Sequence, residues 1–204
     1  MIEQLLLIRH GETVHNAAGI AQGWNDSALS DEGRRQVVRL ATRLVPLHPT
    51  EIYSSPLGRA LTTAQLIGEA CKLPVTTIDD LREMSYGSWE GRSFLDVRRE
   101  DNDTYLRWVA DPDVPSPQGE SHNDVLRRMQ RAFETIEANG GGRGGRRVVV
   151  VTHGTAIRIG TTALLGVPVN AARSFAQDNA SLNLFFWRSD RYVLKVWNDT
   201  SHCQ

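Results

Sequence analysis

The chain has 204 residues, 40% of them hydrophobic and 23% charged, which is enough for one globular domain with its own core, so residues 1–204 are expected to form a single domain. Its formal net charge of −1 excludes a global electrostatic field for binding nucleic acid or an anionic membrane. Two cysteines are too few for a disulfide framework or a cysteine-rich zinc site, and the N-terminal apolar run, LLLI, is far shorter than a signal sequence or a membrane span. We therefore expect a cytoplasmic protein that binds a small molecule, and the sequence does not indicate its oligomeric state.

The N-terminal part predicts a buried strand and then an amphipathic helix. Residues 4–8 (QLLLI) form a short apolar run that ends at Arg-His-Gly, which is typical of a buried strand leading into a polar loop. Residues 31–45 predict a helix with Ser30 as its N-cap and two acidic residues in its first turn. The apolar face of this helix is expected to contain Val37, Val38, Leu40, Ala41 and Leu44.

A second strand and a second helix follow. Residues 51–53 (EIY) predict the strand, and the next segment predicts a helix in which Ser55 is the N-cap and Pro56 is the first helical residue. Arg59 then lies in the first turn of this helix. Residues 75–78 (VTTI) predict a third short strand.

The central part of the chain separates these elements from a long helix. From residue 79 to residue 118 the sequence is irregular, aromatic and rich in arginine, and we expect it to cover a pocket. Residues 119–138 predict a long helix, which the glycine run at 140–145 ends. That run lacks the preceding strand and the following Lys-Ser/Thr of a nucleotide-binding phosphate loop, so we interpret it as a flexible surface turn.

The C-terminal part repeats the opening pattern. Residues 146–154 (RRVVVVTHG) predict a buried strand that is again followed by His-Gly, residues 155–166 predict a helix, and residues 182–187 and 191–197 predict a hairpin. Strands that alternate with helices predict an α/β fold with a mainly parallel sheet covered by helices on both faces. Because such sheets bind ligands beyond the carboxyl ends of their strands, we expect both His-Gly pairs at the binding site.

The Arg-His pair that ends the first strand is suited to phosphate chemistry. The planar guanidinium of Arg9 offers several donors to phosphate oxygens, and the imidazole of His10 can act as a nucleophile near neutral pH. An Arg-His-Gly tripeptide alone is also compatible with a hydrogen-bonded structural histidine, so the interpretation depends on the other motifs.

Five motifs occur together in a fixed order. They are LIRHGETVHN at 7–16, SSPLGRALTTA at 54–64, LREMSYGSWEG at 81–91, GES at 119–121 and VVVTHGTAIR at 149–158. In this order they closely resemble the histidine phosphatase superfamily, also called phosphoglycerate mutase-like, over nearly the whole chain. The resemblance implies a three-layer α/β sandwich.

The resemblance also implies the catalytic residues. His10 is the phosphorylated nucleophile, Arg9, Arg59 and His153 complete the phosphate pocket, and Glu83 is the proton donor. This set of residues is chemically reasonable, because two guanidinium groups and an imidazolium at His153 can neutralise the phosphoryl oxygens. An alkoxide is a poor leaving group, so a carboxylic acid against the ester oxygen lowers the barrier, and the same group can later serve as a base toward water.

Further contacts are expected around the phosphate. By resemblance, Asn16, the backbone around Gln22 and Gly23, and the backbone of Thr155 face it. Gly11 and Gly154 either let the backbone approach the substrate or serve only in tight turns.

Other histidines and aromatic residues are not included in the catalytic set. His15, Tyr86, Trp89 and Trp108 either line the substrate side or pack, and His48, His122 and His202 are interpreted as surface histidines. No His-Glu-x-x-His run or acidic cluster occurs, so we expect neither a metal nor another cofactor.

The favoured function is the hydrolysis of small phosphorylated metabolites through a phosphohistidine. This function predicts a metal-independent histidine phosphatase of the acid type, which is a phosphoric monoester hydrolase. A cofactor-dependent phosphoglycerate mutase is the first alternative. Mutases of this superfamily carry a longer, more basic insertion between the acid and the second histidine, whereas this chain is compact there, although Arg92, Arg98, Arg99 and Arg107 remain candidates for binding a substrate carboxylate. A non-catalytic phospholigand-binding module is the second alternative, and the presence of both nucleophile and acid favours catalysis over it.

Overall fold

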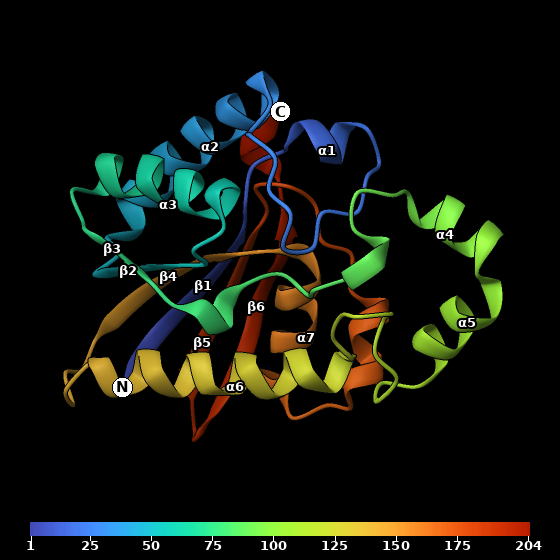
Figure 1. Ribbon diagram of the computed structural model, residues 1–204. Coiled ribbons are helices and arrows are strands. Elements are labelled where there is room, and N and C mark those ends of the chain that lie inside the picture. The colour runs from blue at the N-terminus through green and yellow to red at the C-terminus, as the bar shows by residue number, and fades with distance from the viewer.

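The computed structural model describes residues 1–204 and contains one six-stranded sheet with the order β3-β2-β4-β1-β5-β6 (Figure 1). Neighbouring strands from β3 to β1 are parallel, and β5 pairs antiparallel with both β1 and β6. The predicted mainly parallel α/β sheet and the C-terminal hairpin are therefore confirmed. The strands are β1 (Ile2–Arg9), β2 (Glu51–Ser54), β3 (Val75–Thr77), β4 (Arg146–Thr152), β5 (Leu182–Arg188) and β6 (Arg191–Asp199).

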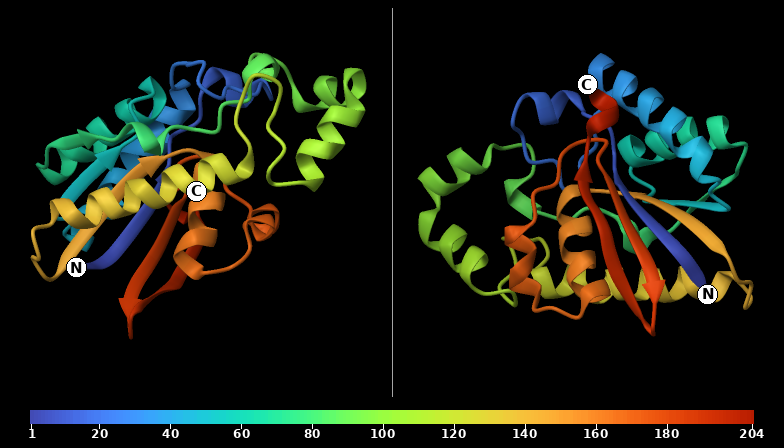
Figure 2. Two further views of the ribbon diagram at one scale, coloured as in Figure 1. Left: turned by 60° about the horizontal axis from the view of Figure 1, so that its bottom comes forward. Right: turned by 180° about the vertical axis from the view of Figure 1, so that it is seen from behind.

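Helices cover both faces of the sheet and give three layers (Figure 2). One face carries α2 (Asp31–Leu44) and α3 (Gly58–Cys71), and the other carries α6 (His122–Asn139) and α7 (Gly154–Leu165). Three short helices, α1 (Val14–Ala17), α4 (Phe94–Glu100) and α5 (Asn102–Ala110), lie beyond the sheet. None of the helices is both long enough and apolar enough to cross a membrane.

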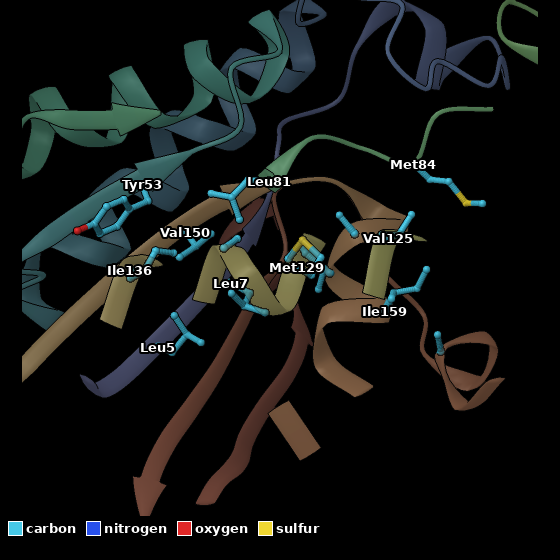
Figure 3. Packing of buried hydrophobic residues seen from close by; sticks show 14 of the residues in the cluster. Leu5, Leu7, Tyr53, Leu81, Met84, Val125, Met129, Ile136, Val150 and Ile159 are labelled. Atoms are coloured by element: carbon cyan, nitrogen blue, oxygen red, sulfur yellow. The ribbon is translucent and has the colours of Figure 1, made fainter. Parts of the chain in front are cut away.

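The inner strands are apolar on both faces because both faces are covered. Side chains alternate along a strand, so in β1 Leu5 and Leu7 pack toward α6, while Leu6 and Ile8 pack toward α2 and α3. Figure 3 shows the α6 side, where Leu7 lies beside Met129 and Leu5 belongs to the same cluster. This two-sided core fixes the positions of the strand ends, which is where the polar residues follow.

The caps of two helices explain where those helices begin. Ser30 caps α2 as predicted, because its side chain accepts a hydrogen bond from the Gly33 N–H. The predicted cap of α3 was wrong: Leu57 occupies that position, and the helix begins at Gly58, beyond Pro56. Ser55 has a different role, described below. One helix-face residue was also misplaced, since Val38 is exposed on α2.

The segment predicted to be irregular and to cover a pocket contains α4 and α5. These two helices stand to one side of the sheet, beyond the N-terminal end of α6 (Figure 1). The segment leaves and returns at adjacent points, because Ser88 N–H donates to the Pro117 carbonyl (3.0 Å) and Glu120 N–H donates to the Ser85 carbonyl (2.9 Å). The two ends of the segment between these points are therefore hydrogen-bonded to each other.

Candidate active site

The two His-Gly pairs follow adjacent parallel strands and so lie side by side. Arg9 at the end of β1 is in register with Thr152 at the end of β4, and the His10 N–H donates to the Thr152 carbonyl at 3.0 Å. The imidazole of His10 consequently packs edge-on against that of His153, with 5.1 Å between ring centroids. The parallel pairing of two apolar strands thus juxtaposes residues that are far apart in the sequence.

His10 has the properties of a nitrogen nucleophile. Its Nδ1 lies 2.8 Å from the Gly11 carbonyl oxygen, which can only accept, so Nδ1 carries the proton and Nε2 keeps its lone pair. Burial, and then the charges of Arg59 and Arg9, lower the pKa of His10 well below its ordinary value. The imidazole is therefore neutral at neutral pH, as an attacking nitrogen must be.

His153 is buried behind His10 and is held by Ser55. The Nε2 atom of His153 lies 2.8 Å from the Ser55 hydroxyl oxygen, while its Nδ1 has no partner within the protein. Burial, followed by the Arg59 charge, lowers the pKa of His153 as well. In this structure the imidazole is neutral, which differs from the imidazolium expected from the sequence. Ser55 holds this ring instead of capping a helix.

Two buried guanidinium groups lie beside the histidines. Arg59 is only 2% exposed, and its Nη atoms donate to the carbonyls of Asn25 (2.9 Å) and Gly23 (2.7 Å). Arg9 donates to the carbonyl of Gln177 through Nη1. Burial lowers the pKa of both groups, and the Nε–H of each has no partner within the protein. Arg59 Nη1 also forms an ion pair with Asp26 at 3.2 Å, and the free Nε–H donors of the two guanidinium groups are suited to an anionic ligand.

Glu83 is held by three backbone amides. Its carboxylate accepts hydrogen bonds from the N–H groups of Met84 (2.8 Å), Thr155 (3.1 Å) and Ala156 (3.1 Å), the last two in the first turn of α7. The backbone of Glu83 is fixed in turn by Arg128 of α6, whose Nη2 donates to the Glu83 carbonyl at 3.0 Å. Both ends of the residue are therefore anchored.

These side chains surround one cavity of about 350 Å³. Of the nine site residues predicted from the sequence, eight line it, and His153 lies behind His10. The eight are Arg9, His10, Asn16, Gln22, Gly23, Arg59, Glu83 and Thr155. The cavity sits beyond the carboxyl ends of β1 and β4, where a mainly parallel sheet is expected to bind its ligand.

The family model of the "Histidine phosphatase superfamily (branch 1)" matches residues 5–200. The chain belongs to the histidine phosphatase superfamily. A relative in Arabidopsis thaliana, named metal-independent phosphoserine phosphatase, is 34% identical over 206 residues, which cover 98% of this chain and 83% of the relative. Another in Erwinia tasmaniensis, named "Probable phosphoglycerate mutase GpmB", is 32% identical over 211 residues, covering 98% and 95%.

A solved structure of a mycobacterial glucosyl-3-phosphoglycerate phosphatase in complex with VO3 superposes with a TM-score of 0.86. It is 33% identical, and the match covers 96% of this chain and 99% of that one. The relatives of this superfamily member therefore include both phosphatases and a protein named as a mutase.

Two of the expected backbone contacts are already used within the protein. The Thr155 N–H, expected to donate to phosphate, donates to the Glu83 carboxylate at 3.1 Å in this structure. The Gly23 carbonyl accepts from Arg59, and Gly23 has a positive φ of 54°. A Cβ on Gly11 would lie 2.7 Å from the Gly33 carbonyl oxygen, so this glycine is needed for packing against α2, which supports the structural alternative.

Glu90 connects the two loops that border the cavity. Its carboxylate accepts hydrogen bonds from the backbone N–H groups of Trp24 (3.0 Å), Asn25 (3.1 Å) and Tyr86 (3.0 Å). Residues 22–25 and 83–90 are therefore held together by one side chain. Sequence reasoning missed this role, although Glu90 lies within the motif GSWEG.

The predicted carboxylate-binding arginines do not line the cavity. Arg92 and Arg99 pair with acidic neighbours on or beside α4, and Arg98 and Arg107 are exposed. Arg158 lines the cavity instead, because it lies one turn after Thr155 on α7 and donates to the Thr155 hydroxyl at 3.0 Å. That helical spacing, already present in THGTAIR, is the signal that could have identified it.

The remaining aromatic and histidine residues divide between core and pocket. Tyr86 lines the cavity, and Trp89 is buried in the core. His122, interpreted from the sequence as a surface residue, is instead half-buried against Trp108, with 5.0 Å between ring centroids. No cluster of three or more His, Cys, Asp or Glu side chains is placed to hold a metal ion.

Proposed function

We propose that the protein hydrolyses phosphomonoesters through a phosphohistidine at His10. The observation that carries this proposal is the combination of a neutral, buried imidazole with a free Nε2 and two guanidinium groups around one cavity. Glu83, in the same cavity, supplies the carboxyl group that the leaving oxygen needs.

In the first step, His10 Nε2 attacks phosphorus. A nitrogen–phosphorus bond forms as the bond from phosphorus to the ester oxygen breaks, and the carboxyl proton of Glu83 passes to the departing oxygen, giving a free alcohol. Arg9 and Arg59 stabilise the negative charge on the remaining phosphoryl oxygens, and their unpartnered Nε–H groups are available for this purpose.

In the second step, water attacks the phosphoryl group and His10 Nε2 departs with the bonding electron pair. The Glu83 carboxylate accepts a proton from the attacking water, which restores the acid, and inorganic phosphate is released. His153 and Ser55 position His10 from behind, because the two imidazoles are in contact. No step requires a metal.

The alternatives differ in where the phosphoryl group goes. A mutase returns it to a sugar acid, and a binding module does not transfer it. The relative named as a mutase makes isomerisation of 3-phosphoglycerate a necessary comparison. None of the four arginines expected to serve a mutase lines the cavity, and Arg92 and Arg99 pair with acidic neighbours, which favours hydrolysis.

The test is to trap the intermediate. The protein is mixed with p-nitrophenyl phosphate that carries its label in the phosphoryl group. The mixture is quenched in alkali, because a phosphorus–nitrogen bond is acid-labile, and the protein is then digested for peptide mapping. We expect the label on the peptide with His10 and none in His10→Ala. A label on any other residue, or phosphate release without a protein-bound label, contradicts the mechanism. The proposal also includes the expectations from the sequence that the protein is one domain, acts in the cytoplasm on small metabolites and has no nucleic acid partner.

A further inference from the structure

A second pocket of about 290 Å³ adjoins the phosphate cavity. The two share four lining residues, Tyr86, Phe94, Thr155 and Arg158, so a molecule in one can extend into the other. We call the second one the side pocket. A group attached to a phosphate at His10 has this pocket as its neighbour.

Aromatic rings form much of the wall of the side pocket. Phe94 and Trp108, from α4 and α5, are nearly parallel, with an interplanar angle of 12° and centroids 6.0 Å apart, and Tyr86 meets Phe94 edge-on at 5.1 Å. Ile159 of α7 and Ala172 of the 3₁₀ segment Val169–Ser174 also line the pocket. A cavity of roughly 150 Å³ is enough for benzene, so this pocket can hold a substituted ring.

The charged groups that line the side pocket are both cations, and its other polar side chains are Tyr86, Tyr105, Thr155, Trp108 and His122. Arg158 and Arg173 line it, neither forms an ion pair, and no acidic side chain is among the lining residues. The Trp108 Nε1 and His122 Nδ1 atoms are buried without partners. Burial, and then the charges of Arg173 and Arg158, lower the pKa of His122 to about 4, so this imidazole is neutral beside the two guanidinium groups. Such a pocket attracts an anion.

We propose that the side pocket binds the leaving group of the substrate, and that this group joins a flat, apolar body to a carboxylate recognised by Arg158 and Arg173. The inference rests on the proposed hydrolysis and narrows its substrate class to anionic aromatic phosphomonoesters. Amino acid phosphates fit this pocket poorly. The side pocket offers their ammonium no counter-charge, and Glu83, the only acidic side chain lining either pocket, is held by backbone amides.

The first experiment compares substrates whose leaving alcohols have similar basicity. Ethyl and benzyl phosphate test the apolar wall, and the 3- and 4-carboxybenzyl phosphates with their carboxamide counterparts test the charge. We expect kcat/KM to rise about 10-fold from ethyl to benzyl phosphate. For at least one of the two ring positions, kcat/KM of the carboxylate should be about 10-fold higher than that of its carboxamide counterpart, as expected for a charge-assisted hydrogen bond. Phosphoserine should be a poorer substrate than benzyl phosphate.

The second experiment uses Arg173→Gln, which changes an exposed residue on the rim of the pocket. We expect the preference for carboxylate over carboxamide to fall about 10-fold. Arg98→Gln is the matched control, because Arg98 is exposed, lines neither pocket and should leave the preference within about twofold.

The outcomes separate the two proposals. If none of these phosphates, nor p-nitrophenyl phosphate, is hydrolysed, the proposed function fails. If benzyl phosphate is hydrolysed but carboxylate and carboxamide react equally, or if Arg173→Gln leaves their ratio unchanged, hydrolysis stands and the side-pocket assignment is overturned. A better rate with phosphoserine than with any benzyl phosphate overturns it too.

Discussion

Arg128 on α6 anchors the segment that carries Glu83. Its guanidinium forms a two-point pair with Glu120, with Nε at 2.8 Å from Oε1 and Nη2 at 2.9 Å from Oε2. It also donates to the carbonyls of Asp80, Arg82 and Glu83. The side chains of Arg128 and Glu120 are 7% and 18% exposed. The substitution Arg128→Met therefore leaves a largely buried carboxylate without its counter-charge.

The size of the effect follows from this burial. Removing one partner of a buried ion pair costs about 3 to 5 kcal/mol, and for a chain of this size that corresponds to a fall in Tm of roughly 6 to 20 °C. Urea unfolding followed by circular dichroism measures the free energy, and the m-value shows whether the transition remains two-state. Turnover of an alkyl phosphate at 25 °C should also fall, because Glu83 loses one of its anchors and this leaving group needs its proton.

A neighbouring residue provides the control. Arg127 has the same charge and length but pairs with Asp124 on the exposed side of α6, so Arg127→Met should cost less than about 1 kcal/mol. In the double variant Arg128→Met/Glu120→Gln the loss should be at least about 1 kcal/mol smaller than the sum of the single losses. Additive losses, or an Arg128→Met variant as stable as Arg127→Met, would refute the assigned role.

Four further outcomes are expected. Hydrolysis should persist in excess chelator, and complete loss restored by a divalent ion would falsify the metal-free mechanism. In single turnover, Glu83→Gln should slow phosphoryl transfer from an alkyl phosphate by about 100-fold to 10,000-fold. The loss should be much smaller with p-nitrophenyl phosphate, because its phenolate leaves unprotonated, and equal losses with the two substrates would contradict the acid role of Glu83. Ser55→Ala leaves His153 Nε2 buried without a partner and should cost about 1 to 3 kcal/mol in urea unfolding, and a neutral result contradicts that contact. The pKa of His122 lies near 4 against an ordinary 6.5, so between these values the unfolded chain binds the extra proton and stability falls as pH is lowered. His122→Asn should lessen this loss of unfolding free energy by up to about 1 kcal/mol per pH unit. His48→Asn, at an exposed position, should not change it, and identical slopes for the two variants would contradict the burial of His122.

The strands and main helices were predictable because their signals are local. The apolar run before each His-Gly pair predicts a buried strand, and the parallel arrangement of such strands then predicts that His10 and His153 meet. Ser30 was identified as a cap because an N-cap depends only on residues within one turn.

Contacts between distant segments were not predictable from the same patterns. Ser55 has the residue type and position of a cap, but its hydroxyl is used by His153 from another strand end. His122 looks like a surface residue in the sequence because its partner, Trp108, comes from the covering segment. The neutral state of His153 depends on burial and on nearby guanidinium groups, neither of which a motif reveals.

Residues 91–115 form a segment whose two ends are hydrogen-bonded to each other, so this segment can be exchanged as a unit. Glu90 fastens the chain before the excursion, and the bonds from Ser88 to Pro117 and from Glu120 to Ser85 fasten the two ends to each other. Because doubling the length of a loop with fixed ends costs only about 0.6 kcal/mol, a longer or shorter excursion need not disturb the histidines and arginines behind it. Since α4 and α5 supply Phe94 and Trp108, exchanging this one segment alters the wall of the side pocket, whereas the histidines and arginines of the phosphate cavity come from other elements. The proposed leaving-group site and the proposed phosphoryl chemistry therefore depend on different parts of the chain.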